Sequence, residues 1–135
     1  MIADTYDRLM LALAVWREAR GEPLDGKRGV AWVILNRMAD PRWPDSAAEV
    51  VTQPWQFSCF NAGDPNATKY PTQKRSVDWG AWLECCVVVD GLAGDLDPTS
   101  GANHYEAISD SDKRPNWADP VKITWQVGRT RFYRI

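Results

Sequence analysis

The chain has 135 residues, of which 44% are hydrophobic and 25% charged, and its formal net charge is −2. These values predict one soluble globular domain over residues 1–135 and do not favour a nucleic-acid partner. No apolar run approaches the ~18–20 residues that cross a bilayer, so no stable membrane association is expected.

Helical periodicity dominates the first two thirds of the chain. Apolar residues spaced three and four apart predict a first helix over residues 4–20, which Gly21 and Pro23 end. Three further helices are predicted, over residues 25–39, 46–53 and 76–90. Ser46 and Glu49 form a capping box at the start of the third. Trp79 and Trp82, one turn apart, are expected to bury a face of the fourth.

The remaining segments predict a long loop and a small sheet. Residues 54–74 are rich in Pro, Asn, Gly, Asp and Thr and are expected to be irregular. Residues 102–105 are a candidate short strand, and alternation from Ile123 to Val127, followed by Gly128, predicts a terminal hairpin. The predicted fold class is therefore α+β, helix-rich, with a small antiparallel sheet.

Cysteine and histidine usage argues against several catalytic chemistries. A catalytic zinc site usually has three His- or Cys-dominated ligands, and the chain has one histidine, His104, and no H-E-x-x-H motif. His104 could serve a cysteine nucleophile, but no nucleophile motif frames Cys59, Cys85 or Cys86, which are expected to be reduced and mostly buried. Neither a metal nor another cofactor is predicted.

Carboxylate chemistry remains, and Glu18 is its best candidate. Cleavage of a glycosidic bond needs a carboxylic acid that is still protonated near neutral pH, which burial against apolar side chains favours. Glu18 follows Trp16 at the end of an apolar helix, where the helix dipole adds ~0.5 kcal/mol in the same direction. Arg17 and Arg20 oppose this unless they point elsewhere. Glu22, just outside the helix, is the rival acid, and an ordinary solvated helix end is the alternative for both.

Several short motifs then occur in a distinctive order: Glu18-Ala-Arg-Gly-Glu22, Val33-Ile-Leu-Asn-Arg37, Gln53-Pro54, Gln56-Phe57-Ser58, Asp97-Pro98-Thr99, Ala102-x-x-Tyr105, Pro115-x-Trp117-Ala118, and Gly128 with Phe132-Tyr133. With them the sequence resembles the SleB-type cell wall hydrolase family, which includes spore cortex-lytic enzymes and some phage endolysins. The resemblance covers residues 9–134 and implies a lysozyme-like fold. One departure is Thr130, where the family often carries His.

The resemblance implies cleavage of peptidoglycan glycan strands between N-acetylmuramic acid and N-acetylglucosamine, with Glu18 as the catalytic acid. We expect the other site residues to bind substrate: Gln53, Ser58 and Tyr105 by hydrogen bonds, Phe57, Trp55 and Trp117 at sugar subsites, and Glu22 beside Glu18. Structural alternatives are open for several of them. Phe57 could belong to the core, Tyr105 could be an ordinary sheet residue, and Ser58 could be a turn hydroxyl.

A single acid favours lytic transglycosylation, in which no water is activated. A hydrolytic muramidase usually needs a second carboxylate, for which spacing singles out none of Glu22, Asp25, Asp97 and Glu106. A hydrolytic muramidase and a non-catalytic glycan-binding module stay open as alternatives.

The biological setting predicted from the sequence is that of a monomeric phage endolysin. Asp4 and Asp7 precede the first apolar run, where a signal peptide would carry basic residues. We therefore expect synthesis in the host cytoplasm without a signal peptide and release to the wall through a holin.

Overall fold

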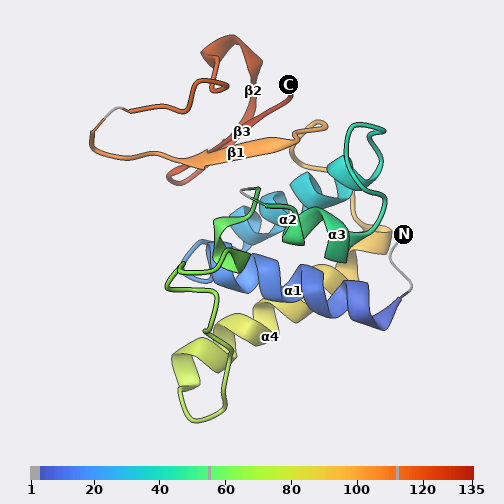
Figure 1. Cartoon of the computed structure of the whole chain (residues 1–135), viewed down its shortest axis with the longest axis vertical. Helices are drawn as coiled ribbons and strands as arrows, with labels where there is room; N and C mark the ends of the chain where they lie inside the picture. The colour runs from blue at the N-terminus through green and yellow to red at the C-terminus, as the bar shows by residue number, and fades with distance from the viewer. Residues whose placement is uncertain (1–3, 55, 112) are drawn as a thin grey trace.

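The computed structural model describes residues 4–54, 56–111 and 113–135, which form a layer of helices beneath a small sheet (Figure 1). The α-helices are α1 Thr5–Ala19, α2 Leu24–Met38, α3 Ala47–Thr52 and α4 Ser76–Gly91. The 3₁₀ turns are η1 Ser58–Phe60, η2 Leu92–Gly94 and η3 Pro120–Lys122. The strands are β1 His104–Ala107, β2 Ile123–Val127 and β3 Thr130–Tyr133, antiparallel in the order β1-β3-β2. The predicted class, helix-rich α+β with a small antiparallel sheet, is confirmed.

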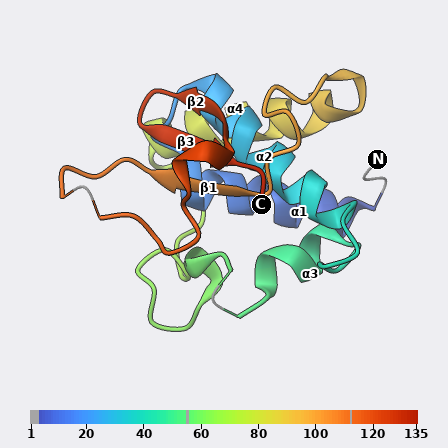
Figure 2. The same cartoon turned by 90° about the horizontal axis from the view of Figure 1, so that it is seen from above.

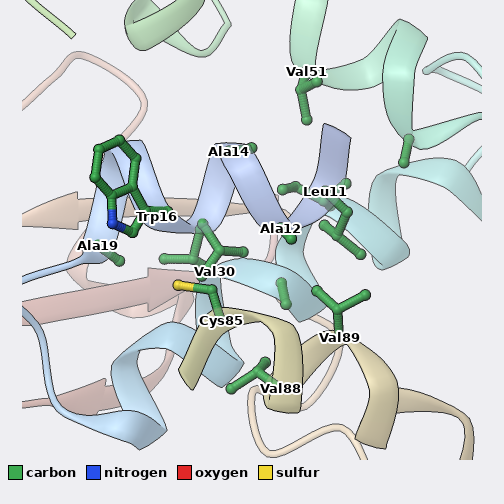
Figure 3. Close-up of a cluster of buried hydrophobic side chains, with 14 of the residues drawn as sticks. Leu11, Ala12, Ala14, Trp16, Ala19, Val30, Val51, Cys85, Val88 and Val89 are labelled. Atoms are coloured by element: carbon green, nitrogen blue, oxygen red, sulfur yellow. The ribbon is translucent and has the colours of Figure 1, made fainter. Parts of the chain in front are cut away.

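Helix α1 is the centre of the helical layer and contacts α2, α3 and α4. Its buried face alternates small and large side chains, so that neighbouring helices approach closely at the alanines while Leu11 and Trp16 fill the space between them. Val30 of α2 and Cys85 of α4 complete this core with other side chains drawn in Figure 3. One half of the predicted capping box is present: the Ser46 hydroxyl accepts a hydrogen bond from the Glu49 backbone amide at 3.2 Å, and the Glu49 carboxylate lies 3.1 Å from the same hydroxyl.

The sheet lies over α2 (Figure 2), and a glycine makes that contact possible. A Cβ atom at Gly29 would lie 2.3 Å from Cζ of Phe132, a central residue of β3. Val33 and Ala102 pack around the same ring. The sheet therefore rests directly on the α2 backbone at this point.

Asn36 and Arg37 of α2 hold the entry to β1. The Asn36 amide donates to the Ala102 carbonyl at 2.8 Å and to Asp97 Oδ2 at 2.9 Å. Arg37 Nε donates to the Asn103 carbonyl at 2.7 Å. The predicted strand at 102–105 is shifted to His104–Ala107, because α2 takes up the two carbonyls that precede it.

Two other details differ from the predictions. Trp79 and Trp82 are only partly buried and line an open groove with Leu9, whose exposed fraction is 52%. The described part of the predicted loop, residue 54 and residues 56–74, is mostly irregular, as predicted, but contains η1. Cys59 and Cys85 are buried and Cys86 partly so, all three as free thiols. No helix in the described ranges is long and apolar enough to cross a membrane.

Candidate active site

A cleft of about 450 Å³ opens between the end of α1, the turn η1 and the strand β1. Five of the residues predicted from the sequence line it together: Glu18, Phe57, Ser58, Tyr105 and Trp117. The sheet and the helical layer each contribute one wall. Residues separated by up to 99 positions along the chain therefore meet at one site.

Glu18 lies in the last turn of α1, half-buried, with both carboxyl oxygens engaged. The Tyr105 hydroxyl donates to Oε2 at 3.0 Å, and the Cys59 backbone amide lies 3.4 Å from Oε1. The tyrosine comes from β1 and the amide from η1, so both walls orient the same carboxyl group. Contacts from both walls fix the orientation of the Glu18 carboxyl group, as expected of a side chain that must meet a substrate in one position.

The two arginines beside Glu18 in sequence point away from it. Arg17 donates through Nε to the Lys69 carbonyl at 3.1 Å, with its guanidinium 4.8 Å from the Phe60 ring centroid. Arg20 donates to Asn66 Oδ1 at 3.0 Å. Neither forms an ion pair with Glu18 within the described ranges. Both arginines instead hold the 59–69 segment, and Glu18 has no cationic partner among the residues that the structure describes.

Burial sets the protonation of the groups that contact Glu18. It raises the pKa of the Tyr105 hydroxyl well above its ordinary value, and the neighbouring Glu18 carboxyl adds to the shift. Tyr105 therefore keeps its hydroxyl proton and can donate it in a hydrogen bond to Glu18. Burial, with Glu18 second, also raises the pKa of the Cys59 thiol, which disfavours its use as a nucleophile.

The other predicted binding residues lie outside the set that lines this cleft. Glu22 packs its side chain against Gly26, where a Cβ atom would come within 3.1 Å of the Glu22 Cβ. Gln53 caps the end of α3, and its buried Oε1 has no hydrogen-bond partner among the described residues. The prediction for Trp55 falls outside the described residues.

The candidate second carboxylates are engaged elsewhere. Asp97 accepts hydrogen bonds from Thr99, Asn36 and the Gly101 amide, which lower the pKa of Asp97 although burial, the largest single influence, opposes them. Asp25 is exposed and paired with Arg28. Among the described residues that line the cleft, Glu18 is the only carboxylate. Nor do any three His, Cys, Asp or Glu side chains in the described ranges cluster closely enough to hold a metal ion.

Glu106, the last of these candidates, lies on β1 beside Tyr105 but is directed to the opposite face of the strand. It is buried, pairs with Arg131 at 3.1 Å and accepts a hydrogen bond from the Tyr133 hydroxyl. This acid holds the sheet together and is separate from the cleft.

Three cleft residues were not predicted as site residues: Arg37, Gln56 and His104. Arg37 is buried and donates to Gln56 Oε1 at 3.3 Å, while Phe57 and Trp43 cover its guanidinium. The sequence did contain a signal for Arg37, because this arginine ends the Val33-Ile-Leu-Asn-Arg37 motif on an apolar helix, and a buried arginine needs polar and aromatic partners. His104, whose ring centroid lies 4.8 Å from that of Trp117, had no comparable signal.

Thr130, the position where the family often carries His, does not line the cleft. It is buried in β3, opposite Ala107 of β1 and Val127 of β2. Its side chain therefore packs within the sheet.

Comparisons with known proteins agree with the motifs. The family model described as Cell Wall Hydrolase matches residues 21–133. The spore cortex-lytic enzyme of Bacillus subtilis is 44% identical over 129 residues, which cover 96% of this chain and 35% of that protein. The chain thus spans about a third of the length of this curated relative.

Solved structures give the same result for the fold. The catalytic domain of the Bacillus cereus SleB protein superposes with a TM-score of 0.69 at 26% identity, covering 97% of this chain and 91% of that one. The catalytic domain of the germination-specific lytic transglycosylase SleB from Bacillus anthracis gives a TM-score of 0.68, also at 26% identity, over 97% and 96%. The predicted resemblance and the lysozyme-like fold class are confirmed, and the chain belongs to the cell wall hydrolase family.

Proposed function

We propose that the chain is a lytic transglycosylase that cleaves the N-acetylmuramic acid–N-acetylglucosamine bond of peptidoglycan, with Glu18 as its acid and base. The observation that carries the proposal is a single carboxylate among the described cleft residues, held by Tyr105 and the Cys59 amide and paired with no cation there. Family membership supports the same substrate class.

The reaction uses Glu18 twice. Protonated Glu18 donates its proton to the glycosidic oxygen as the bond from that oxygen to the muramic C1 breaks. The C6 hydroxyl of the same muramic acid then attacks C1, and the Glu18 carboxylate removes the hydroxyl proton, so that a 1,6-anhydro ring closes and Glu18 is protonated again. Because the Tyr105 hydroxyl can donate to the carboxylate or accept from the acid, it can follow Glu18 through both states.

The scheme also explains why one acid suffices. Hydrolysis with retention places a second carboxylate ~5–5.5 Å from the first, and inversion places it ~6.5–9.5 Å away to hold a water. Glu106, Asp97 and Asp25 are engaged by the partners described above. A nucleophile within the substrate removes the need for either arrangement.

Mass spectrometry of digested walls tests the proposal. Purified peptidoglycan is incubated with the protein, and the released muropeptides are examined for their glycan ends. Anhydro ends are expected, whereas reducing ends would instead indicate a hydrolytic muramidase. A glycan-binding module would sediment with the walls and release no new ends.

A second experiment addresses the biological setting. A phage endolysin, the setting expected from the sequence, should act on vegetative walls after release through a holin, whereas similarity to the spore cortex-lytic enzyme of Bacillus subtilis favours spore cortex. Equal amounts of protein are added to purified vegetative sacculi and to purified cortex. Faster release from vegetative sacculi supports the endolysin, and release restricted to cortex favours the spore enzyme.

A further inference from the structure

His104 is a cleft residue that the reaction scheme does not use, and its neighbour Asn103 determines how its ring is protonated. The Asn103 side chain is held by the backbone of Ile135, whose N–H donates to Oδ1 at 3.0 Å and whose carbonyl accepts from Nδ2 at 2.9 Å. This pair of bonds satisfies the amide in one orientation only. In a flipped side chain the Nδ2 donor would face the Ile135 N–H and the Oδ1 acceptor would face the Ile135 carbonyl. The atom of Asn103 that faces His104 is therefore an oxygen.

The orientation of Asn103 selects one tautomer of His104. Asn103 Oδ1 lies 2.8 Å from His104 Nδ1, and since Oδ1 can only accept, Nδ1 must carry the hydrogen. In a neutral ring Nε2 then has a free lone pair. Nε2 makes no hydrogen bond with any of the described residues. His104 lines the cleft, and its Nε2 is an acceptor for which the described part of the chain supplies no donor.

The surroundings keep the imidazole neutral and in place. Burial, followed by the charges of Arg37 and Arg42, lowers the pKa of His104 to about 4. Trp117 lies against one side of the ring at 4.8 Å between centroids, and the edge of Trp43 approaches at 6.0 Å. A rigid ring with a free acceptor is suited to recognising a donor on the substrate.

We propose that His104 accepts, through Nε2, a hydrogen bond from the acetamido N–H of an N-acetylated sugar, and so helps select N-acetylated glycans. The inference rests on the proposed function, because it concerns the same cleft. A sugar hydroxyl both donates and accepts and can pair with many groups, whereas an amide N–H only donates and needs an acceptor. Gln56 Oε1, another acceptor among the cleft residues, already accepts a hydrogen bond from Arg37. Trp117 beside the ring offers an apolar surface for the acetyl methyl group.

Two substitutions separate the acceptor from the shape of the ring. H104F keeps a flat ring against Trp117 but removes the acceptor, and H104Q places an amide oxygen near the former Nε2. Each is combined with E18Q to prevent turnover. Binding of chitotetraose and of cellotetraose, which carries a hydroxyl in place of each acetamido group, is measured by calorimetry, and thermal melting confirms folding.

We expect H104F to weaken chitotetraose binding about five- to tenfold, with less effect on cellotetraose, and H104Q to restore most of the loss. In the background with Glu18 intact, H104F should raise KM on walls and leave kcat within about twofold. Equal losses for the two sugars, unchanged chitotetraose binding by H104F, or no rescue by H104Q would overturn the inference. If these binding effects occur but wild type produces no anhydro ends, the proposed reaction fails and the recognition role stands.

Discussion

A tyrosine–glutamate pair lies on each face of β1, and the two pairs differ in the surroundings of the carboxyl group. On the face toward the cleft, Tyr105 donates to Glu18 at 3.0 Å. On the other face, Tyr133 donates to Glu106, which is also paired with Arg131 at 3.1 Å. Each pair joins a phenol to a carboxyl group, but Glu106 also has a cationic partner, Arg131, whereas Glu18 has none among the described residues.

The cation separates a structural acid from a reactive one. Arg131 and the Tyr133 hydroxyl both bind the Glu106 carboxylate, so this acid is held within the sheet. Glu18 has two arginines next to it in sequence but pairs with neither, because both engage the 59–69 segment. The comparison implies that removing each acid should affect a different property, activity for Glu18 and stability for Glu106.

Glu18→Gln should have the largest effect and would establish the reactive half of the comparison. Loss of the proposed proton donor is expected to lower the rate of muropeptide release by about 10²–10⁴-fold. The melting temperature should change by less than about 2 °C, since Gln can still accept from Tyr105. Turbidity clearing and product analysis measure the rate, and a variant with a tenth of wild-type activity would remove Glu18 from the mechanism.

Tyr105→Phe should have the next largest effect, and the matched control is Tyr133→Phe on the opposite face. Loss of the donor to Glu18 is expected to lower kcat about tenfold or more, because a hydrogen bond to a charged group is worth ~1.5–3 kcal/mol. Phe57 and Phe132 keep the ring of Tyr105 in place. Tyr133→Phe should leave kcat within about twofold, and equal losses in the two variants would contradict the distinction.

Glu106→Gln tests the structural pair. Arg131 would lose its ionic partner in a largely buried site, at an expected cost of about 2 kcal/mol in the free energy of unfolding. Chemical denaturation measures this loss. Activity per folded molecule should stay near that of wild type, and a large fall in kcat without a loss of stability would place Glu106 in the reaction.

The pH dependence of stability should show the smallest effect, and it arises from His104, which lines the cleft. The pKa of His104 is lowered from 6.5 to about 4 in the folded chain. Below pH 6.5 the unfolded chain binds a proton that the folded chain does not, so stability is full above pH 6.5 and falls as the pH drops toward 4. Because the ring is only half-buried, we expect a loss of about 1 kcal/mol, visible in melting curves and absent from His104→Gln.

The fold was largely predictable because its signals are local. Apolar spacing, caps and breakers placed all four helices within about two residues, since these patterns act over one or two turns of the same segment. The predicted start of β1 was wrong by two residues, because Asn36 and Arg37 take up the preceding carbonyls. The predicted burial of Trp79 and Trp82 was only partly met, since the face they share with Leu9 stays open.

The site was predictable in its residue types and less so in its contacts. By itself the sequence determined that an apolar helix ends at Glu18 and that its motifs match one family. Tertiary structure alone decided that Tyr105, 87 residues away, holds Glu18, that Glu22 is not among the residues lining the cleft, and that no described residue donates to His104 Nε2. Successive helix residues are rotated by ~100° and successive strand residues by ~180°. Adjacency in sequence therefore says little about which charges meet, and only the packing of distant segments settles it.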